Sequence, residues 1–99
     1  MRELIEGTIK WAADRNLLDN SGAERQALKA GSELGEFYDE ILKGDREKQI
    51  MECGDVLVTL ILTSYKLGFD IETALGAALH KISNRTGKTV NGVFVKDAS

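Results

Sequence analysis

Residues 33–55 read ELGEFYDEILKGDREKQIMECGD and carry two acidic motifs, one on each side of Gly44. Glycine commonly ends a helix and aspartate commonly begins one, so Gly44 and Asp45 predict a connection of one or two residues between two helices. So short a connection requires the helices to lie side by side and antiparallel. The stretch therefore predicts a helical hairpin at the centre of the fold.

Four carboxylates of the two motifs are expected at one level of this hairpin. Glu36 and Glu52 each stand eight residues from Gly44, and Glu33 and Asp55 each stand eleven residues from it. At about 1.5 Å per residue, the inner pair lies about 12 Å and the outer pair about 16 Å from the turn. Residues three apart share a helix face, so the four side chains converge. Because uncompensated negative charges repel one another, a divalent cation is expected among them.

The type of cation follows from the ligands. Carboxylates without a nearby histidine suit Mg²⁺ or Mn²⁺ better than zinc, and the one histidine, His80, is expected on another helix. Mg²⁺ commonly pairs with substrate phosphates, which indicates hydrolysis of a phosphate ester or anhydride. The alternative is that these acids only line solvated helix faces, as Asp39, Glu40 and Glu47 are expected to do.

The rest of the chain predicts an all-α fold, an antiparallel four-helix-bundle-like domain that ends in a short hairpin or an extended tail. Ser21 and Glu24 match a capping box for the second helix, and Asp70 is a natural N-cap for the fourth. An Asn-Gly pair at 91–92, between β-branched residues, indicates a hairpin turn. The expected single domain spans residues 1–99, with helices over 2–14, 21–43, 46–67 and 71–85 and a tail over 88–99.

Composition limits the class of partner. The 99 residues carry 13 Lys and Arg against 16 Asp and Glu, and this net charge of -3 argues against a nucleic-acid polymer. The most apolar run, residues 56–62, is too short to span a bilayer, and no secretory signal is visible. The single cysteine, Cys53, fits a reducing compartment. A cytoplasmic protein without a membrane partner is expected.

The third expected helix indicates assembly. Between Val56 and Leu62 it is apolar around nearly its whole circumference, so it must be covered on several sides. Three partner helices in so short a chain leave part of it bare. We therefore predict a homo-oligomer, a dimer or a tetramer, with this helix in or near the interface. The alternative is that it forms the central helix of a monomeric bundle.

The acidic motifs also resemble the signature of a known family. Glu33-x-x-Glu36, fifteen residues and then Glu52-x-x-Asp55 is similar to the pattern of the MazG-like all-α nucleoside triphosphate pyrophosphohydrolases. Many members have a further glutamate directly before the first motif, where this chain has Ser32. The resemblance extends to Trp11 with Asp14-Arg15, Gln26-x-x-Lys29, Arg85-x-Gly87-Lys88 and Asn91-Gly92-Val93-Phe94-Val95-Lys96.

The resemblance implies a Mg²⁺-dependent enzyme that hydrolyses a nucleoside or deoxynucleoside triphosphate to a monophosphate and pyrophosphate. It also implies that helix pairs from two or more subunits build the bundle. The implied catalytic residues are Glu36 and Glu52, and the implied metal ligands are Glu33, Glu36, Glu52 and Asp55. The alternatives are a non-catalytic partner or regulatory subunit, and a hydrolase of another nucleotide phosphoanhydride.

Substrate contacts are expected from cations and from an aromatic residue. Lys29 lies one helical turn before the first motif, where it could contact phosphate or only pair with the adjacent glutamate. Trp11 could stack on a base or fill the core, and Gln26 could read a base edge or face solvent. A further group near the end of the fourth helix could bind phosphate or merely complement the helix dipole. This group is Lys81, Asn84 and Arg85.

Overall fold

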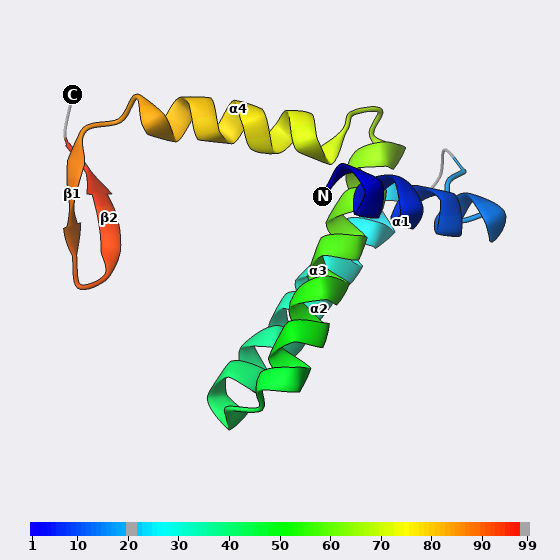
Figure 1. Ribbon diagram of the computed structural model, residues 1–99, viewed down its shortest axis with the longest axis horizontal. Coiled ribbons are helices and arrows are strands. Elements are labelled where there is room, and N and C mark those ends of the chain that lie inside the picture. Colours follow the sequence, from blue (N-terminus) through cyan, green and yellow to red (C-terminus); the bar gives the residue numbers. More distant parts are fainter. Residues whose placement is uncertain (20–21, 98–99) are drawn as a thin grey trace.

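The computed structural model describes residues 1–19 and 22–97, which form four helices and one two-stranded hairpin (Figure 1). The all-α class with a short C-terminal hairpin is therefore confirmed. No helix within these two ranges is long and apolar enough to cross a membrane. The elements are α1 (Arg2–Asp14), α2 (Ala23–Lys43), α3 (Arg46–Lys66), α4 (Ile71–Ser83), β1 (Gly87–Val90) and β2 (Val93–Lys96).

Helices α2 and α3 form the expected antiparallel pair and lie side by side (Figure 1). Gly44 ends α2 with a φ of 78°, and its N–H donates to the carbonyl of Glu40 at 3.0 Å. This left-handed conformation favours glycine. Asp45 then caps α3, because its carboxylate accepts a hydrogen bond from the N–H of Lys48 at 3.2 Å. The two-residue connection fixes the register of the two acidic motifs.

The other helix ends lie within two residues of the expected positions. Helix α2 begins at Ala23, after Gly22 with a φ of 86°, and the predicted capping residue Ser21 lies outside the described residues. Helix α3 ends one residue early, at Lys66, because the chain turns at Gly68 with a φ of 90°. At the hairpin, the residues at 91–92 both have positive φ, of 52° and 78°, as an Asn-Gly turn predicts.

Helix α4 projects away from the α2–α3 pair, so the four helices of one chain leave the bundle open (Figure 1). Asp70 caps α4, and its carboxylate accepts a hydrogen bond from the N–H of Glu72 at 2.7 Å. Arg2, at the start of α1, forms ion pairs of 2.9 Å with Asp70 and 2.7 Å with Glu72. The hydrogen bond from Arg2 lowers the pKa of the Asp70 carboxyl. These contacts hold the corner from which α4 departs.

The buried core of one chain is small. Its radius of gyration is 16.1 Å, whereas a compact domain of about 100 residues has a radius of about 13 Å. Large apolar side chains on α2, α3 and α4 stay exposed. A single chain is therefore an open structure rather than a closed globule. The buried apolar residues in the described part of the chain are Ile5, Ala12, Ala30, Ile61 and Leu62.

Replacing Asp70 with asparagine is expected to lower the melting temperature at pH 7, because asparagine keeps the helix cap but loses the ion pair with Arg2. The pKa of Asp70 is lowered in the folded state. The stabilisation of the fold by the ionised Asp70 carboxylate is therefore complete when the pH is above the unfolded-state pKa of about 3.9. It is lost as the pH falls below that pKa. Circular-dichroism melts should show the deficit at pH 7 and a smaller one near pH 3. The control Asp39→Asn should show no such deficit, and a deficit that is independent of pH would contradict the assignment.

Candidate metal centre and adjoining cavity

Three carboxylates of the acidic motifs meet where α2 faces α3. Glu33 and Glu36 come from α2 and Glu52 comes from α3, and each offers an oxygen within 4.8 Å of the other two. Glu33 and Glu52 are half-buried, whereas Glu36 is exposed. Equal spacing from the turn at Gly44 thus brings side chains of both motifs together. These three residues are called the acidic cluster below.

Asp55 lies at the edge of the acidic cluster. Its negative charge raises the pKa of both Glu33 and Glu52. It is not among the three residues whose oxygens lie within 4.8 Å of one another. Asp55 also borders a groove between α1 and α3 that Trp11 and Val58 line. Asp55 therefore lies between the acidic cluster and α1.

Burial and mutual repulsion make the acidic cluster unfavourable without a cation. Burial raises the pKa of both Glu33 and Glu52, and the negative charge of Glu36 raises both further. The ammonium group of Lys29 acts on the pKa of Glu33 in the opposite direction. One carboxylate oxygen of Glu52 is inaccessible to solvent and accepts no hydrogen bond within the described part of the chain. A buried anionic oxygen without a partner is costly, so this arrangement fits a bound cation.

The donor atoms of the acidic cluster suit a hard divalent cation. Carboxylate oxygens are the ligands of Mg²⁺ and Mn²⁺, whereas zinc sites favour nitrogen and sulfur. Opposite ligands of an octahedral Mg²⁺ lie about 4.2 Å apart. The oxygens of the cluster lie within 4.8 Å of one another, so a shared ion draws them closer, to about 3 Å for adjacent ligands. The acidic cluster can therefore hold such an ion.

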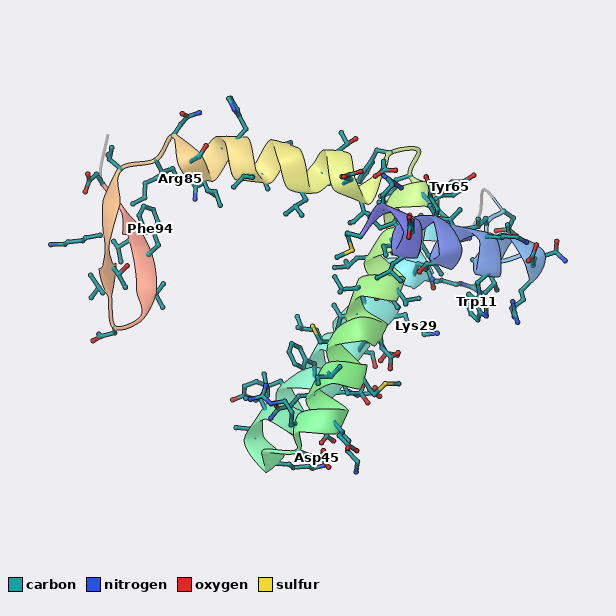
Figure 2. The ribbon with its side chains drawn as sticks, viewed as in Figure 1. Trp11, Lys29, Asp45, Tyr65, Arg85 and Phe94 are labelled. Atoms are coloured by element: carbon teal, nitrogen blue, oxygen red, sulfur yellow. The ribbon has the colours of Figure 1, made fainter. Side chains whose placement is uncertain are left out.

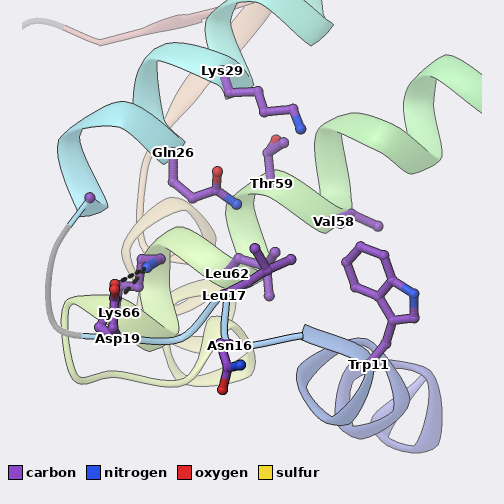
Figure 3. Close-up of a pocket in the computed structure, with 11 residues that line it drawn as sticks. Trp11, Asn16, Leu17, Asp19, Gln26, Lys29, Val58, Thr59, Leu62 and Lys66 are labelled. Atoms are coloured by element: carbon purple, nitrogen blue, oxygen red, sulfur yellow. Dashed lines mark hydrogen bonds and ion pairs between the residues drawn. The ribbon is translucent and has the colours of Figure 1, made fainter. Parts of the chain in front are cut away.

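A cavity of about 320 Å³ opens where α1 and the loop after it meet α2 and α3 (Figure 3). Three of the expected substrate contacts, Trp11, Gln26 and Lys29, line this cavity. Figure 3 shows the side chains of Gln26 and Lys29 extending from α2 into it. The charge of Lys29 also lowers the pKa of Glu33, so this lysine lies between the cavity and the acidic cluster.

Trp11 is partly exposed rather than part of the core. Its side chain is 46% exposed, and the guanidinium of Arg15 lies 4.7 Å from the ring centroid. Arg15 also donates a hydrogen bond to the backbone carbonyl of Trp11 at 3.1 Å. This cation–π contact helps to hold the indole in place, with its ring reaching the cavity beside Val58 (Figure 3). The aromatic surface is thus positioned for a ligand in the cavity.

Several further residues shape the cavity, beyond the substrate contacts predicted from the sequence. The ammonium of Lys66 donates to the backbone carbonyl of Asp19 at 3.1 Å and to its carboxylate at 3.3 Å, which ties the loop after α1 to the end of α3. Thr59 and Leu62 are buried beside them, and Asn16 lines the cavity with a φ of 58°. The Lys66 contact spans 47 positions of sequence, so no local pattern indicates it.

The basic group on α4 lies away from the acidic cluster of its own chain. Lys81, Asn84 and Arg85 are exposed, and Figure 2 shows Arg85 at the outer end of α4, far from Lys29 on α2. The side-chain amide of Asn84 donates to the backbone carbonyl of His80 at 3.0 Å. The structure of one chain therefore does not bring these three predicted substrate contacts to the site.

Glu40 differs from its expected role on a solvated helix face. It is buried, with Lys43 3.6 Å from one carboxylate oxygen, and its backbone carbonyl accepts a hydrogen bond from the side chain of Gln49 at 3.1 Å. The residue lies one turn beyond Glu36 on the face of α2 that meets α3. Its burial is therefore a consequence of the tight pairing of the two helices.

Comparison with known proteins identifies the class to which the fold and site belong. Residues 24–90 match the model of the MazG nucleotide pyrophosphohydrolase domain, and the chain belongs to this family. The resemblance seen in the sequence is therefore confirmed. Membership supports a metal-dependent nucleotide pyrophosphohydrolase in general terms.

A relative from a bacterial virus is also similar to the chain. The chain is 29% identical over 62 residues to an uncharacterized 18.2 kDa protein in the rep-hol intergenic region of Haemophilus phage HP1 (strain HP1c1). The match covers 63% of this chain and 38% of the phage protein, so the chain spans well under two thirds of that relative. No solved structure matches the chain significantly.

Replacing Glu52 with glutamine tests whether the acidic cluster binds a cation. In EDTA the variant should melt at a higher temperature than the wild type, because one of several repelling charges is gone. With saturating Mg²⁺ the order should reverse, since the wild type gains more binding free energy. The control Glu47→Gln, on an exposed position of α3, should keep the same difference from the wild type in both conditions. A difference for Glu52→Gln that ignores Mg²⁺ would exclude this residue from the metal site.

Proposed function

We propose that the chain hydrolyses a nucleoside or deoxynucleoside triphosphate to a monophosphate and pyrophosphate. The observation that carries this proposal is the convergence of three carboxylates near a cavity lined by Trp11; one of their oxygens is buried and has no hydrogen-bond partner among residues 1–19 and 22–97. Family membership supports the reaction type. In this proposal Mg²⁺, or Mn²⁺ as a substitute, is held by Glu33, Glu36, Glu52 and Asp55.

The geometry of α2 favours one orientation of the substrate. Four of its residues recur at intervals of three and four and so lie on one helix face, namely Gln26, Lys29, Glu33 and Glu36. Gln26 and Glu33 are about 10 Å apart along the helix axis. The base then lies in the cavity, where Trp11 stacks on it and Gln26 bonds to its edge. The phosphates extend past Lys29 towards the acids.

The protein contributes ligands and a base to the reaction. A bound Mg²⁺ would polarise the phosphate oxygens and orient the attacking water. Glu36 or Glu52 accepts a proton from the attacking water. The oxygen of this water bonds to the α-phosphorus, the bond from the α-phosphorus to the α–β bridging oxygen breaks, and pyrophosphate leaves. Burial raises the pKa of Glu52, which makes its carboxylate a stronger base than an ordinary glutamate. Glu36 is exposed, and its negative charge raises the pKa of both Glu33 and Glu52.

The proposed assembly is a homo-oligomer, either a dimer or a tetramer, in the cytoplasm. Leu57 and Leu60 of α3 are 45% and 40% exposed in one chain. A fully covered central helix of a monomeric bundle would bury both side chains, so their exposure favours an interface between copies.

Pyrophosphate release from a panel of ribo- and deoxyribonucleoside triphosphates, measured with Mg²⁺ and with EDTA, tests the proposed reaction. Metal-dependent formation of monophosphate and pyrophosphate is expected. Glu52→Gln should abolish turnover without loss of helix content, whereas the control Glu47→Gln should retain turnover. Orthophosphate release would mean cleavage of another anhydride bond. No turnover by a folded, Mg²⁺-bound wild type would contradict the proposal and favour the non-catalytic partner subunit.

Replacing Leu60 with aspartate is expected to dissociate the assembly, because an unpaired charge buried in an interface costs several kcal/mol. The side chain is partly exposed in one chain, so helix content should be retained. Size-exclusion chromatography with light scattering measures the mass. The control Leu60→Met should keep the wild-type mass, and an unaltered mass for Leu60→Asp would show that this face is not the interface.

A further inference from the structure

An ion pair between Lys66 and Asp19 forms one end of the cavity. The ammonium of Lys66, the last residue of α3, donates to the carboxylate of Asp19 at 3.3 Å and to its backbone carbonyl at 3.1 Å. Both residues line the cavity, and Figure 3 shows them across it from Trp11. The side chain of Lys66 is only 7% exposed, whereas that of Asp19 is 68% exposed. A buried cation thus holds a carboxylate that a ligand in the cavity can reach.

This end of the cavity is the one remote from the acidic cluster. Lys66 stands eleven residues beyond Asp55 on α3, which is about 16 Å along the helix axis. Helical side chains lean towards the N-terminus of their helix, so Lys66 leans back from the end of α3 towards the cavity. The proposed path of the substrate runs from the acidic cluster past Lys29 to Gln26. A nucleotide whose phosphates lie at the cluster therefore presents the edge of its base to Asp19.

The common bases differ in the donors and acceptors that they carry on this edge. Guanine presents a ring N–H and an amino group side by side, next to a carbonyl oxygen. Adenine and cytosine present an amino group next to an acceptor nitrogen, and thymine and uracil present one ring N–H between two carbonyl oxygens. Guanine is therefore the common base that offers two adjacent donors followed by one acceptor.

The polar groups of the cavity match the edge of guanine. A carboxylate only accepts hydrogen bonds and has about four acceptor positions, so Asp19 can hold Lys66 and two donors of a base at once. The side-chain amide of Gln26 extends into the cavity, where it can donate to the carbonyl oxygen of the base (Figure 3). Each other base would place an acceptor against one carboxylate oxygen, and two acceptors without a proton between them repel each other.

We infer that the cavity selects guanine nucleotides, with Asp19 as the residue that reads the base and Lys66 as the residue that positions Asp19. The inference rests on the proposed function for the location of the phosphates. Asp19 belongs to the loop after α1, and a loop residue discriminates between ligands only when a supporting contact fixes its geometry. The ion pair with Lys66 supplies that contact.

Equilibrium binding of nucleotide analogues tests the inference without any variant. The analogues carry a methylene group in place of the α–β bridging oxygen, and calorimetry with Mg²⁺ measures their affinities for the wild type. The guanine analogue should bind about tenfold tighter than the hypoxanthine analogue, which lacks only the amino group and leaves one oxygen of Asp19 without its donor. Equal affinities for these two, tighter binding of another base, or no binding of any analogue would overturn the inference.

The variant Asp19→Asn separates base reading from a purely structural role. Asparagine replaces one acceptor oxygen by a donor, so the preference for guanine over hypoxanthine should fall to near unity. If Asp19 only ties the loop to α3, the variant weakens every analogue by the same factor and keeps the ratio, and this result would overturn the inference. The control Asp14→Asn, whose carboxylate pairs with Lys10 outside the cavity, should keep the wild-type ratio.

The inference and the proposed function fail separately, because the analogues cannot be hydrolysed at the α–β bridge. Selective binding of the guanine analogue by a chain that releases no pyrophosphate from deoxyguanosine triphosphate would contradict the proposed function and leave the inference standing. Metal-dependent turnover of all the triphosphates with equal kcat/KM would support the proposed function and overturn the inference.

Discussion

The alignment of α2 with α3 by the turn at Gly44 and Asp45 is the constraint on which the site depends. A left-handed glycine followed by a capping aspartate allows one register, and residues at equal distances from the turn then face each other. A slip of one residue rotates each side chain by about 100° and separates the carboxylates. The register concentrates negative charge in half-buried positions, where burial and repulsion raise the pKa of Glu33 and Glu52. Such perturbed carboxylates are typical of functional sites, and a divalent cation removes the conflict.

The fold of one chain is incomplete in the part that the structure describes. Its core is small, its bundle is open, and α4 projects away from α2 and α3, while Lys29 lies between the acidic cluster and the cavity. In the proposed homo-oligomer, a second copy covers the apolar faces that one chain leaves exposed. The stability of each chain would then depend on the assembly, as in obligate homodimers whose monomers do not persist alone.

The sequence predicts those features that depend on neighbours in the chain. The cap at Asp45, the left-handed Gly44 and the Asn-Gly hairpin turn follow from local preferences, and the acidic cluster follows from counting residues outward from the turn. Features that depend on distant partners were not predictable. Lys66 holds Asp19 across 47 positions, and Arg2 holds the start of α4 across about 70. Neither pairing leaves a periodic or local signal in the sequence, so the shape of the cavity and the direction of α4 emerge only from the structure.

The central claim is that the two acidic motifs form one divalent-cation site. Anomalous diffraction from crystals grown with Mn²⁺ tests it most directly, because the scattering locates the ion without assumptions about activity. The account predicts a peak bonded to carboxylate oxygens of Glu33, Glu36 and Glu52, with Asp55 at its edge. A Mn²⁺ ion bound elsewhere, or a cluster that stays free of metal at saturating Mn²⁺, would contradict the account.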